Sequence, residues 1–328
     1  MTRGSHHAEP AGIARSALAR ERHPVARLVS LMEDTRPAAA GARDAALAVL
    51  EEKAGARGHA CTVLGLTGTP GSGKSSLLSV TTREMLRQDP AVTIAVVAVD
   101  PSSPMTNGAL LGDRTRMRTD VDERRLYFRS QASVTALGGL SPSTYLVCRA
   151  LAALYDVVLV ETVGIGQSEA DIAHLADRVY LVLAPDGGDD VQLLKAGIVE
   201  IPDAFVVNKA DAPGASRTYH QLRANLWLAR PLDADDVTIH LASAQRGDGI
   251  PELAAGFLDH RGVEGALSVA DRAPYFFERW VRDEWGRQGL RLLTHDLGGA
   301  AAFLADRGLG ERQEAFARAV RAALRQGS

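Results

Sequence analysis

The chain contains little cysteine. Its only two cysteines in 328 residues are Cys61 and Cys148. Neither belongs to a CxxC or Cys/His spacing, so the sequence offers no disulfide framework and no zinc site of those types. We expect both to be reduced thiols in an apolar core.

Long apolar runs are also missing. No stretch reaches the roughly 20 residues that a membrane-spanning helix needs. The first residues, MTRGSHHAEP, lack the apolar segment of a secretory signal peptide. The sequence therefore predicts a cytoplasmic protein without a membrane partner.

The chain also lacks a strong excess of positive or negative charge. The formal net charge is −3 and the pI is about 6.3, whereas nonspecific nucleic-acid binding usually needs a basic face. We therefore expect no nucleic-acid partner. A local exception is a group of five arginines: Arg114, Arg116, Arg118, Arg124 and Arg125. This group fits either a solvated, partly paired surface or a contact with phosphate or an acidic partner.

Short β-branched runs alternate with helical patterns from residue 62 onward. The runs cover 62–67, 93–99, 125–129, 156–161, 178–184, 204–208 and 237–242. Several are apolar on both faces, which is typical of parallel strands covered by helices on both sides. The alternation predicts a doubly wound, mainly parallel α/β sheet, with ligands bound at the carboxyl ends of its strands.

Helical patterns flank this region. We expect residues 1–24 to be disordered or frayed, followed by helices near 24–35 and 38–54. After residue 262 the strands stop, and two or three helices follow. In the last of them Phe316, Val320 and Leu324 repeat on one face. That stripe fits either dimerisation or packing against the rest of the chain.

The stretch from residue 68 to 75 matches the phosphate-binding pattern GxxxxGK[ST] between a predicted strand and a predicted helix. The glycines allow backbone N–H groups to point inward around phosphates, and the helix N-terminus adds its positive dipole end. We expect Lys74 to neutralise the β- and γ-phosphates and the Ser75 hydroxyl to coordinate Mg²⁺. The predicted nucleotide contacts here are Gly68, Thr69, Pro70, Gly71, Ser72, Gly73, Lys74, Ser75 and Ser76. The alternative, a glycine-rich turn without a ligand, is disfavoured by the flanking strand and helix.

An NKxD pattern, formed by Asn208, Lys209 and Asp211, follows a later strand. The Asp211 carboxylate can accept hydrogen bonds from the ring N1–H and the exocyclic amine of guanine, a donor pair that adenine lacks. Asn208 can bond the opposite edge, and the Lys209 stem can cover the ring. Such a site rejects a base that leaves it unpaired. Ser243 and Ala244, after the next strand, are expected to contact the guanine oxygen. Alone, NKxD also fits a solvated loop, but downstream of a phosphate-binding loop it favours guanine recognition.

Candidate sensors of the γ-phosphate lie between these motifs. Asp100 ends one predicted strand, where a carboxylate can hold Mg²⁺ directly or through water. Asp113 and Thr115 form a second candidate set. Glu161 and Gly164 belong to an ExxG string, in which Gly164 can offer its N–H to the γ-phosphate and Glu161 can reach the water shell of the metal. Each carboxylate could instead be a strand-end cap. Their shared location favours the metal.

Three strings together resemble the MeaB/ArgK-type GTPases, which are chaperones of adenosylcobalamin-dependent acyl-CoA mutases. They are VAVDPSSPMTNGALLGDRTRM, LVETVGIGQSE and VVNKAD. The resemblance covers roughly residues 25–262 and implies a P-loop NTPase G domain with added helices. The predicted parts are an N-terminal tail with helices over 1–60, a G domain over 61–262 and a C-terminal helical dimerisation arm over 263–328.

The resemblance also implies GTP/GDP and Mg²⁺ as ligands, a homodimer, and an acyl-CoA mutase as partner. Methylmalonyl-CoA mutase is the default partner, with isobutyryl- and hydroxyisobutyryl-CoA mutases as competitors. The implied role is to gate cofactor delivery to the mutase and to protect it, while the mutase stimulates GTP hydrolysis.

A third switch loop is implied at residues 186–192, leading to Lys195. Asp189 and Lys195 are its candidates for bringing charge towards the nucleotide. The loop reads PDGGDDVQLLKAG and departs from the family string, which leaves the identity of the partner more open than that of the nucleotide. For Asp189 and Asp190, ordinary capping of a helix N-terminus is the alternative.

No residue stands out as a base that activates water. Gln167 is a candidate by analogy with other GTPases, but it lies three residues beyond Gly164, and we expect it to be a structural or switch residue. We expect hydrolysis to depend on electrostatic positioning and on switch ordering by the partner, and therefore to be slow in the isolated protein. The predicted catalytic residues are Lys74, Asp100, Glu161, Gly164 and Lys195.

Three alternatives stay open. A nickel-inserting GTPase shares this class of G domain but usually carries metal-binding His or Cys sets, whereas here His6 and His7 are adjacent and the other histidines are scattered. A small-molecule kinase would need an acceptor site and has no use for guanine selectivity. A nucleotide-holding scaffold would not need Lys74, Ser75, Asp100 and Glu161 intact.

Overall fold

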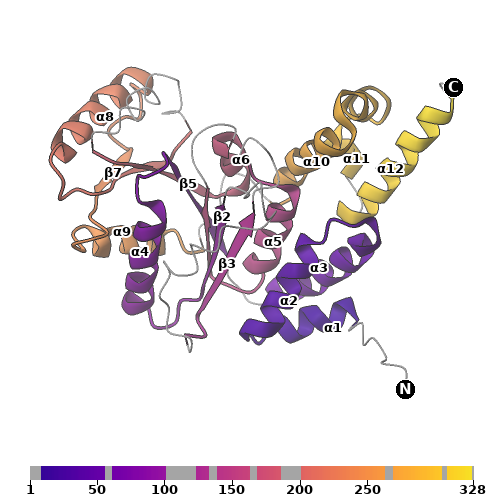
Figure 1. Cartoon of the computed structure of the whole chain (residues 1–328), viewed down its shortest axis with the longest axis horizontal. Coiled ribbons are helices and arrows are strands. Elements are labelled where there is room, and N and C mark those ends of the chain that lie inside the picture. Colours follow the sequence, from indigo (N-terminus) through magenta and orange to yellow (C-terminus); the bar gives the residue numbers. More distant parts are fainter. Residues whose placement is uncertain are drawn as a thin grey trace. The chain divides into compact units, whose positions relative to one another are not determined.

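The computed structural model describes most of the chain as two compact units (Figure 1). The described residues are 9–55, 61–100, 123–132, 139–162, 168–185, 201–262, 269–304 and 309–326. One unit is drawn from residues 60–140 and 155–266. The other combines residues 1–59, 141–154 and 267–328.

The first unit is built on a seven-stranded sheet in which every strand pairs parallel to its neighbours. The strands are β1 (Thr62–Gly68), β2 (Ile94–Asp100), β3 (Leu126–Ala132), β4 (Val157–Glu161), β5 (Arg178–Leu183), β6 (Ala204–Val207) and β7 (Thr238–Leu241). Their order is β3-β2-β4-β1-β5-β6-β7. The predicted doubly wound parallel sheet is confirmed, and each predicted strand is present.

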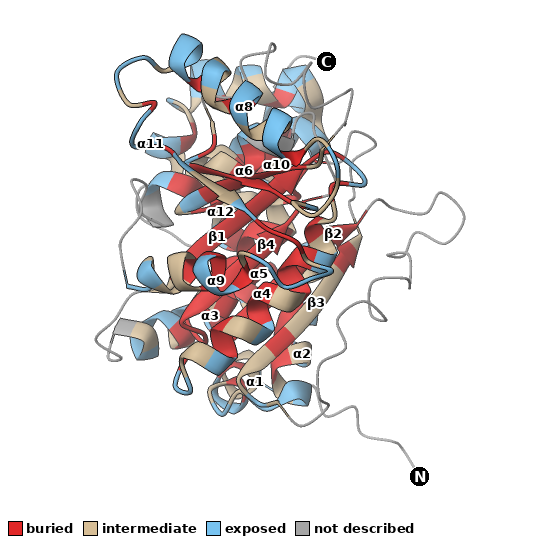
Figure 2. Ribbon diagram, turned by 90° about the vertical axis from the view of Figure 1, so that its left-hand side faces the viewer, coloured by how far each residue is buried: buried red, intermediate tan, exposed pale blue. Residues whose placement is uncertain are grey.

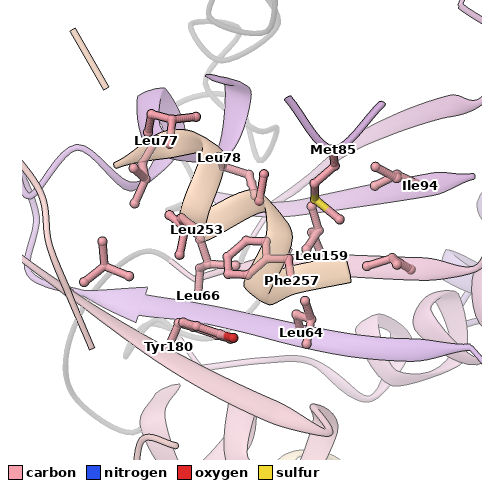
Figure 3. Packing of buried hydrophobic residues seen from close by; sticks show 14 of the residues in the cluster. Leu64, Leu66, Leu77, Leu78, Met85, Ile94, Leu159, Tyr180, Leu253 and Phe257 are labelled. Carbon is pink, nitrogen blue, oxygen red and sulfur yellow. The ribbon is translucent and has the colours of Figure 1, made fainter. Parts of the chain in front are cut away.

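Helices cover both faces of this sheet. They are α4 (Lys74–Gln88), α6 (Ser168–Leu175), α8 (Ala215–Ala229) and α9 (Ile250–Asp259). Side chains of α4 and α9, such as Leu78 and Phe257, lie against Leu64 and Leu66 of β1 (Figure 3). The alternate residues of β5 and β6, which point to the other face, pack against α8. Figure 2 shows the resulting continuous buried layer in the central strands.

The close approach of α6 to β1 depends on Gly65. A Cβ added at this position would lie 2.4 Å from Cγ1 of Ile172 on α6. Because backbone and helix are in direct contact there, only glycine lets β1 stay central while α6 covers it.

The second unit is helical. Its elements are α1 (Pro10–Ala17), α2 (Arg22–Glu33), the 3₁₀ turn η1 (Pro37–Ala39), α3 (Ala40–Gly55), α5 (Pro142–Ala152), α10 (Val269–Arg291), the π-helical turn η4 (Leu292–Asp296), α11 (Ala300–Leu304) and α12 (Leu309–Gln326). Helix α5 belongs here although it lies between two strands in sequence, and its Tyr145 stacks on Phe276 of α10 at 4.8 Å between ring centroids. The division into parts at residues 60 and 262 stays a prediction.

The prediction that residues 1–24 are disordered or frayed is wrong for residues 10–17, which form α1. Ala14 and Ala17 of this helix are fully buried. The helix has eight residues and uses small side chains to pack, so it lacks the large apolar residues at helical spacing that would reveal it in the sequence. Its stability comes from tertiary contact rather than from its own propensity.

Helix α12 packs within the helical unit through part of its apolar stripe. The ring of Phe316 meets those of Phe277, Trp280 and Phe303 at centroid distances of 5.8, 6.0 and 5.9 Å. Further along the stripe, Leu324 is 57% exposed. Within the described residues, no helix combines the length and the apolarity needed to cross a lipid bilayer.

Candidate nucleotide-binding site

Those predicted site residues that the structure describes gather at the carboxyl edge of the sheet around β1. The chain passes from β1 to β2 on one side and later from β4 to β5 on the other, so the strand order reverses next to β1. In open α/β sheets, ligands bind at such a switch point. The fold therefore brings the ends of β1, β2, β4 and β6 to one place.

The phosphate-binding loop lies between β1 and α4 and depends on left-handed glycines. Gly73 has a φ of 85°, and an added Cβ would lie 2.5 Å from Nδ2 of Asn208. This position therefore requires glycine both for its backbone conformation and for the space it leaves.

Lys74 places its ammonium group at this loop. The side chain is buried, and Nζ donates hydrogen bonds to the carbonyl oxygens of Gly68 at 2.8 Å and Thr69 at 2.9 Å. Helix α4 begins at the same residue, so its first N–H groups and the positive end of its dipole lie beside the ammonium. This arrangement is suited to binding phosphate.

The NKxD motif at residues 208–211 is tied to the phosphate-binding loop by hydrogen bonds. Nδ2 of Asn208 donates to the Ser72 carbonyl oxygen at 2.8 Å, and Nζ of Lys209 donates to that of Gly71, also at 2.8 Å. On its other side, Oδ1 of Asn208 accepts from the Ala244 N–H at 3.3 Å. Three segments that are distant in sequence thus form one connected site.

Asp211 is held as an ionised carboxylate. The Ser243 hydroxyl donates to its Oδ1 at 2.5 Å, and Nε of Arg246 lies 3.8 Å from its Oδ2. The hydrogen bond from Ser243, with a smaller effect of the Arg246 charge, lowers the pKa of Asp211 below its usual value. A carboxylate in this state accepts hydrogen bonds only, so it suits a ligand edge that presents donors, such as the predicted guanine.

Three of the predicted metal ligands, Ser75, Asp100 and Glu161, lie on the same face of the sheet. Ala98 of β2 pairs with Glu161 of β4, so Asp100, two residues further along β2, points to the same side as Glu161. The Ser75 hydroxyl on α4 donates to Oε1 of Glu161 at 2.6 Å. On the other side of β2, the Ser130 hydroxyl of β3 donates to Oδ2 of Asp100 at 2.6 Å. Ser130 was not identified from the sequence.

This donor set fits Mg²⁺. Both carboxylates are more than nine-tenths buried, and every candidate ligand atom is an oxygen, which hard cations prefer. Mg²⁺ in nucleotide sites is held by one or two carboxylates or hydroxyls together with phosphates and water. No group of three or more His, Cys, Asp or Glu residues is placed to hold a metal within the parts of the chain that the structure describes.

For several predicted site residues, the structure gives no contact that bears on their predicted role. Pro70 in the phosphate-binding loop and Ser76 in the first turn of α4 are exposed. Asp113, Gly164 and Lys195 lie outside the described residues, as do Thr115, Gln167, Asp189 and Asp190. Their roles stay predictions.

Of the five grouped arginines, Arg125 is paired within the chain, as expected for a partly paired surface. It lies 2.8 Å from Glu123 in an ion pair and donates to the carbonyl oxygens of Leu86, Asp89 and Pro90 at the end of α4. A cation that caps a helix C-terminus has a structural role. Arg114, Arg116 and Arg118 lie outside the described residues.

A family model described as methylmalonyl Co-A mutase-associated GTPase MeaB matches residues 25–279. The chain belongs to the MeaB family. The resemblance inferred from the three sequence strings is thereby confirmed, and the matched range includes every predicted site residue.

Several similar proteins have names that refer to GTPases or to an acyl-CoA mutase. A putative GTPase of Pyrococcus horikoshii is 44% identical over 64% of this chain and 63% of that protein, so the chain spans less than two thirds of that relative. The GTPase ArgK of Escherichia coli is 36% identical over 71% of this chain and 69% of ArgK. The fused isobutyryl-CoA mutase of Cupriavidus metallidurans is 34% identical over 76% of this chain but only 23% of its own length.

A solved structure supports the fold of this MeaB family member. The crystal structure of an LAO/AO transport system kinase matches with a TM-score of 0.61 over 89% of both chains, at 24% sequence identity. At this level of identity the likeness concerns the fold alone.

Proposed function

We propose that this MeaB family member binds GTP with Mg²⁺ and hydrolyses it to GDP and phosphate. The observation that carries the proposal is the pair of hydrogen bonds from Asn208 and Lys209 to carbonyl oxygens of the phosphate-binding loop. An NKxD loop that was merely solvated would not be expected to form these hydrogen bonds with the phosphate-binding loop. The anchoring sets the distance between base and phosphates, which a guanine nucleotide must span.

Each group then has a defined task. Asp211 accepts the two donors of guanine, and Lys74 neutralises phosphate charge beside the N-terminus of α4. The hydroxyl of Ser75 and the carboxylates of Asp100 and Glu161 would hold Mg²⁺ directly or through water. When bound, the metal would neutralise charge that develops on the phosphates.

We further propose that hydrolysis is slow in the isolated protein. Neither buried carboxylate is set apart as a base for water, because each is hydrogen-bonded to a serine: Glu161 to Ser75 and Asp100 to Ser130. Rate enhancement would then depend on electrostatic positioning, with switch segments ordered by a partner. Gly164 and Lys195 remain candidates in those segments.

The proposed partner is an adenosylcobalamin-dependent acyl-CoA mutase, for which the chain would gate cofactor delivery and which it would protect. The description of the MeaB family supports this, and so does the Cupriavidus relative, in which a similar region is part of a protein named as a fused mutase. We also propose that the chain forms a homodimer through its C-terminal helices, in keeping with the exposed Leu324 on α12.

The deciding experiment is release of inorganic phosphate from GTP and ATP by the purified chain, alone and with a panel of cobalamin-dependent acyl-CoA mutases. We expect slow, GTP-selective turnover that one mutase stimulates, and none from Lys74→Ala. Equal use of ATP would overturn the guanine assignment. If no mutase changes the rate, the mutase partner is wrong while the GTPase proposal stands. Transfer of the phosphoryl group to a small molecule would instead identify a kinase.

A further inference from the structure

We infer that Ser130 is a positioning residue that orients the Asp100 carboxylate for Mg²⁺. The inference rests on the proposed GTP and Mg²⁺ binding, and it adds a residue that no sequence motif contains. It starts from one contact, the 2.6 Å hydrogen bond from the Ser130 hydroxyl to Oδ2 of Asp100.

The strand register explains why these two side chains meet. Ser130 of β3 pairs with Ala98 of β2, and Asp100 lies two residues beyond Ala98 on the same face. Ala98 also pairs with Glu161 on the other side of β2. Ser130 and Glu161 therefore flank Asp100 on the face covered by α4, which carries Ser75.

The side-chain pattern of β3 changes where Asp100 lies. On the same face of this strand, Leu126 and Phe128 pack against the apolar cluster below α4. The next residue on that face is Ser130, so the polar group appears only at the carboxyl end of the strand. An apolar residue there would extend the cluster but would leave Oδ2 of the buried Asp100 without this donor.

The hydrogen bond has a specific consequence for metal binding. A buried carboxylate must keep one rotamer to serve as a ligand, and a neighbouring donor fixes that rotamer in advance. One hydroxyl uses only one of about four acceptor positions of a carboxylate, so the contact orients the group without exhausting it.

The test compares variants that differ only in this hydroxyl. Ser130→Ala removes it. Ser130→Thr and Ser130→Val form a matched pair of nearly equal shape, with and without the hydroxyl, and both residues suit a strand. Thr81→Val is the control on α4, because the buried Thr81 hydroxyl has no hydrogen-bond partner and its loss should be neutral.

The readout is the affinity of the full chain with bound GDP for Mn²⁺, measured by electron paramagnetic resonance as a probe of the Mg²⁺ site. Loss of a hydrogen bond to a charged group should weaken Mn²⁺ binding about tenfold in Ser130→Ala and Ser130→Val. Ser130→Thr and Thr81→Val should resemble the wild type. GDP affinity in excess chelator should be the same in all variants, since that measurement contains no metal.

A purely structural role would lower the melting temperature without moving the Mn²⁺ affinity, and that result would overturn the inference. A double-mutant cycle with Asp100→Asn adds a second check, because Ser130→Ala should have little further effect once the carboxylate is gone. If the wild-type chain with GDP binds no Mn²⁺, the proposed function itself fails. If only the variants fail to differ, the inference alone is wrong.

Discussion

Replacing Asp211 by Asn should convert guanine selectivity into xanthine selectivity. The amide oxygen can keep the hydrogen bond from the Ser243 hydroxyl, which the structure places 2.5 Å from Oδ1. The amide nitrogen then takes the position of Oδ2 and turns a donor towards the exocyclic amine of guanine. In xanthine that amine is a carbonyl oxygen, which accepts from the same nitrogen.

The magnitude follows from the two hydrogen bonds that guanine makes to a charged acceptor. Each is worth about 1.5–3 kcal/mol. The substitution removes the bond from the exocyclic amine and leaves the bond from N1–H with a neutral acceptor. Together these changes should cost about 2.5–4.5 kcal/mol, which corresponds to roughly two to three orders of magnitude in affinity. The ion pair with Arg246 is lost too, but its side chain is 66% exposed, so this contributes little.

The assay is competition of GTP, XTP and ATP against a fluorescent guanine nucleotide on the purified chain. Asp248→Asn is a matched control, since Asp248 lies exposed in the neighbouring loop and its substitution removes the same charge. The control should keep the affinity order of the wild type. If Asp211→Asn binds GTP as tightly as the wild type and XTP no better, the assignment of residues 208–211 as the base-reading motif is wrong.

Three further outcomes are expected. Lys74→Ala should weaken GTP binding strongly while the fold is retained, as calorimetry and circular dichroism would show; unaltered affinity would remove Lys74 from the site. Gly73→Ala should destabilise the chain by about 1–2 kcal/mol in urea unfolding because of its left-handed φ, and it should lower GTP affinity by displacing Asn208. Burial lowers the pKa of His240 and of His260, so the native state binds fewer protons than the unfolded chain. Stability should be full above about pH 6.5 and decline below it. Substituting both histidines by Gln should flatten that profile in melting curves.

The core elements of the fold could be read from local sequence. Short β-branched runs predicted the seven strands, and several of these runs are apolar throughout because burial on both sides of a sheet leaves no polar alternation. The glycine and lysine spacing of the phosphate-binding loop was equally readable, since its conformation requires left-handed residues at set positions, as Gly73 shows with a φ of 85°. Such features depend on neighbours within a few residues.

Contacts between segments that are distant in the sequence could not be predicted from local sequence patterns. Helix α1 was missed because its buried Ala14 and Ala17 give no strong periodic signal. The grouping of α5 with helices from both chain ends depends on packing such as that of Tyr145 on Phe276. Neither pattern can be derived from one segment alone.

The sequence by itself determined the chemistry available in this chain: a phosphate-binding loop, a guanine-type motif and buried carboxylates at strand ends. Only the tertiary structure decided how these groups are held. It anchored Asn208 to Ser72, paired Ser75 with Glu161 and set Ser130 beside Asp100. The physical reason is that strand order and register bring together groups separated by 30 to 136 positions, and no local pattern encodes that proximity.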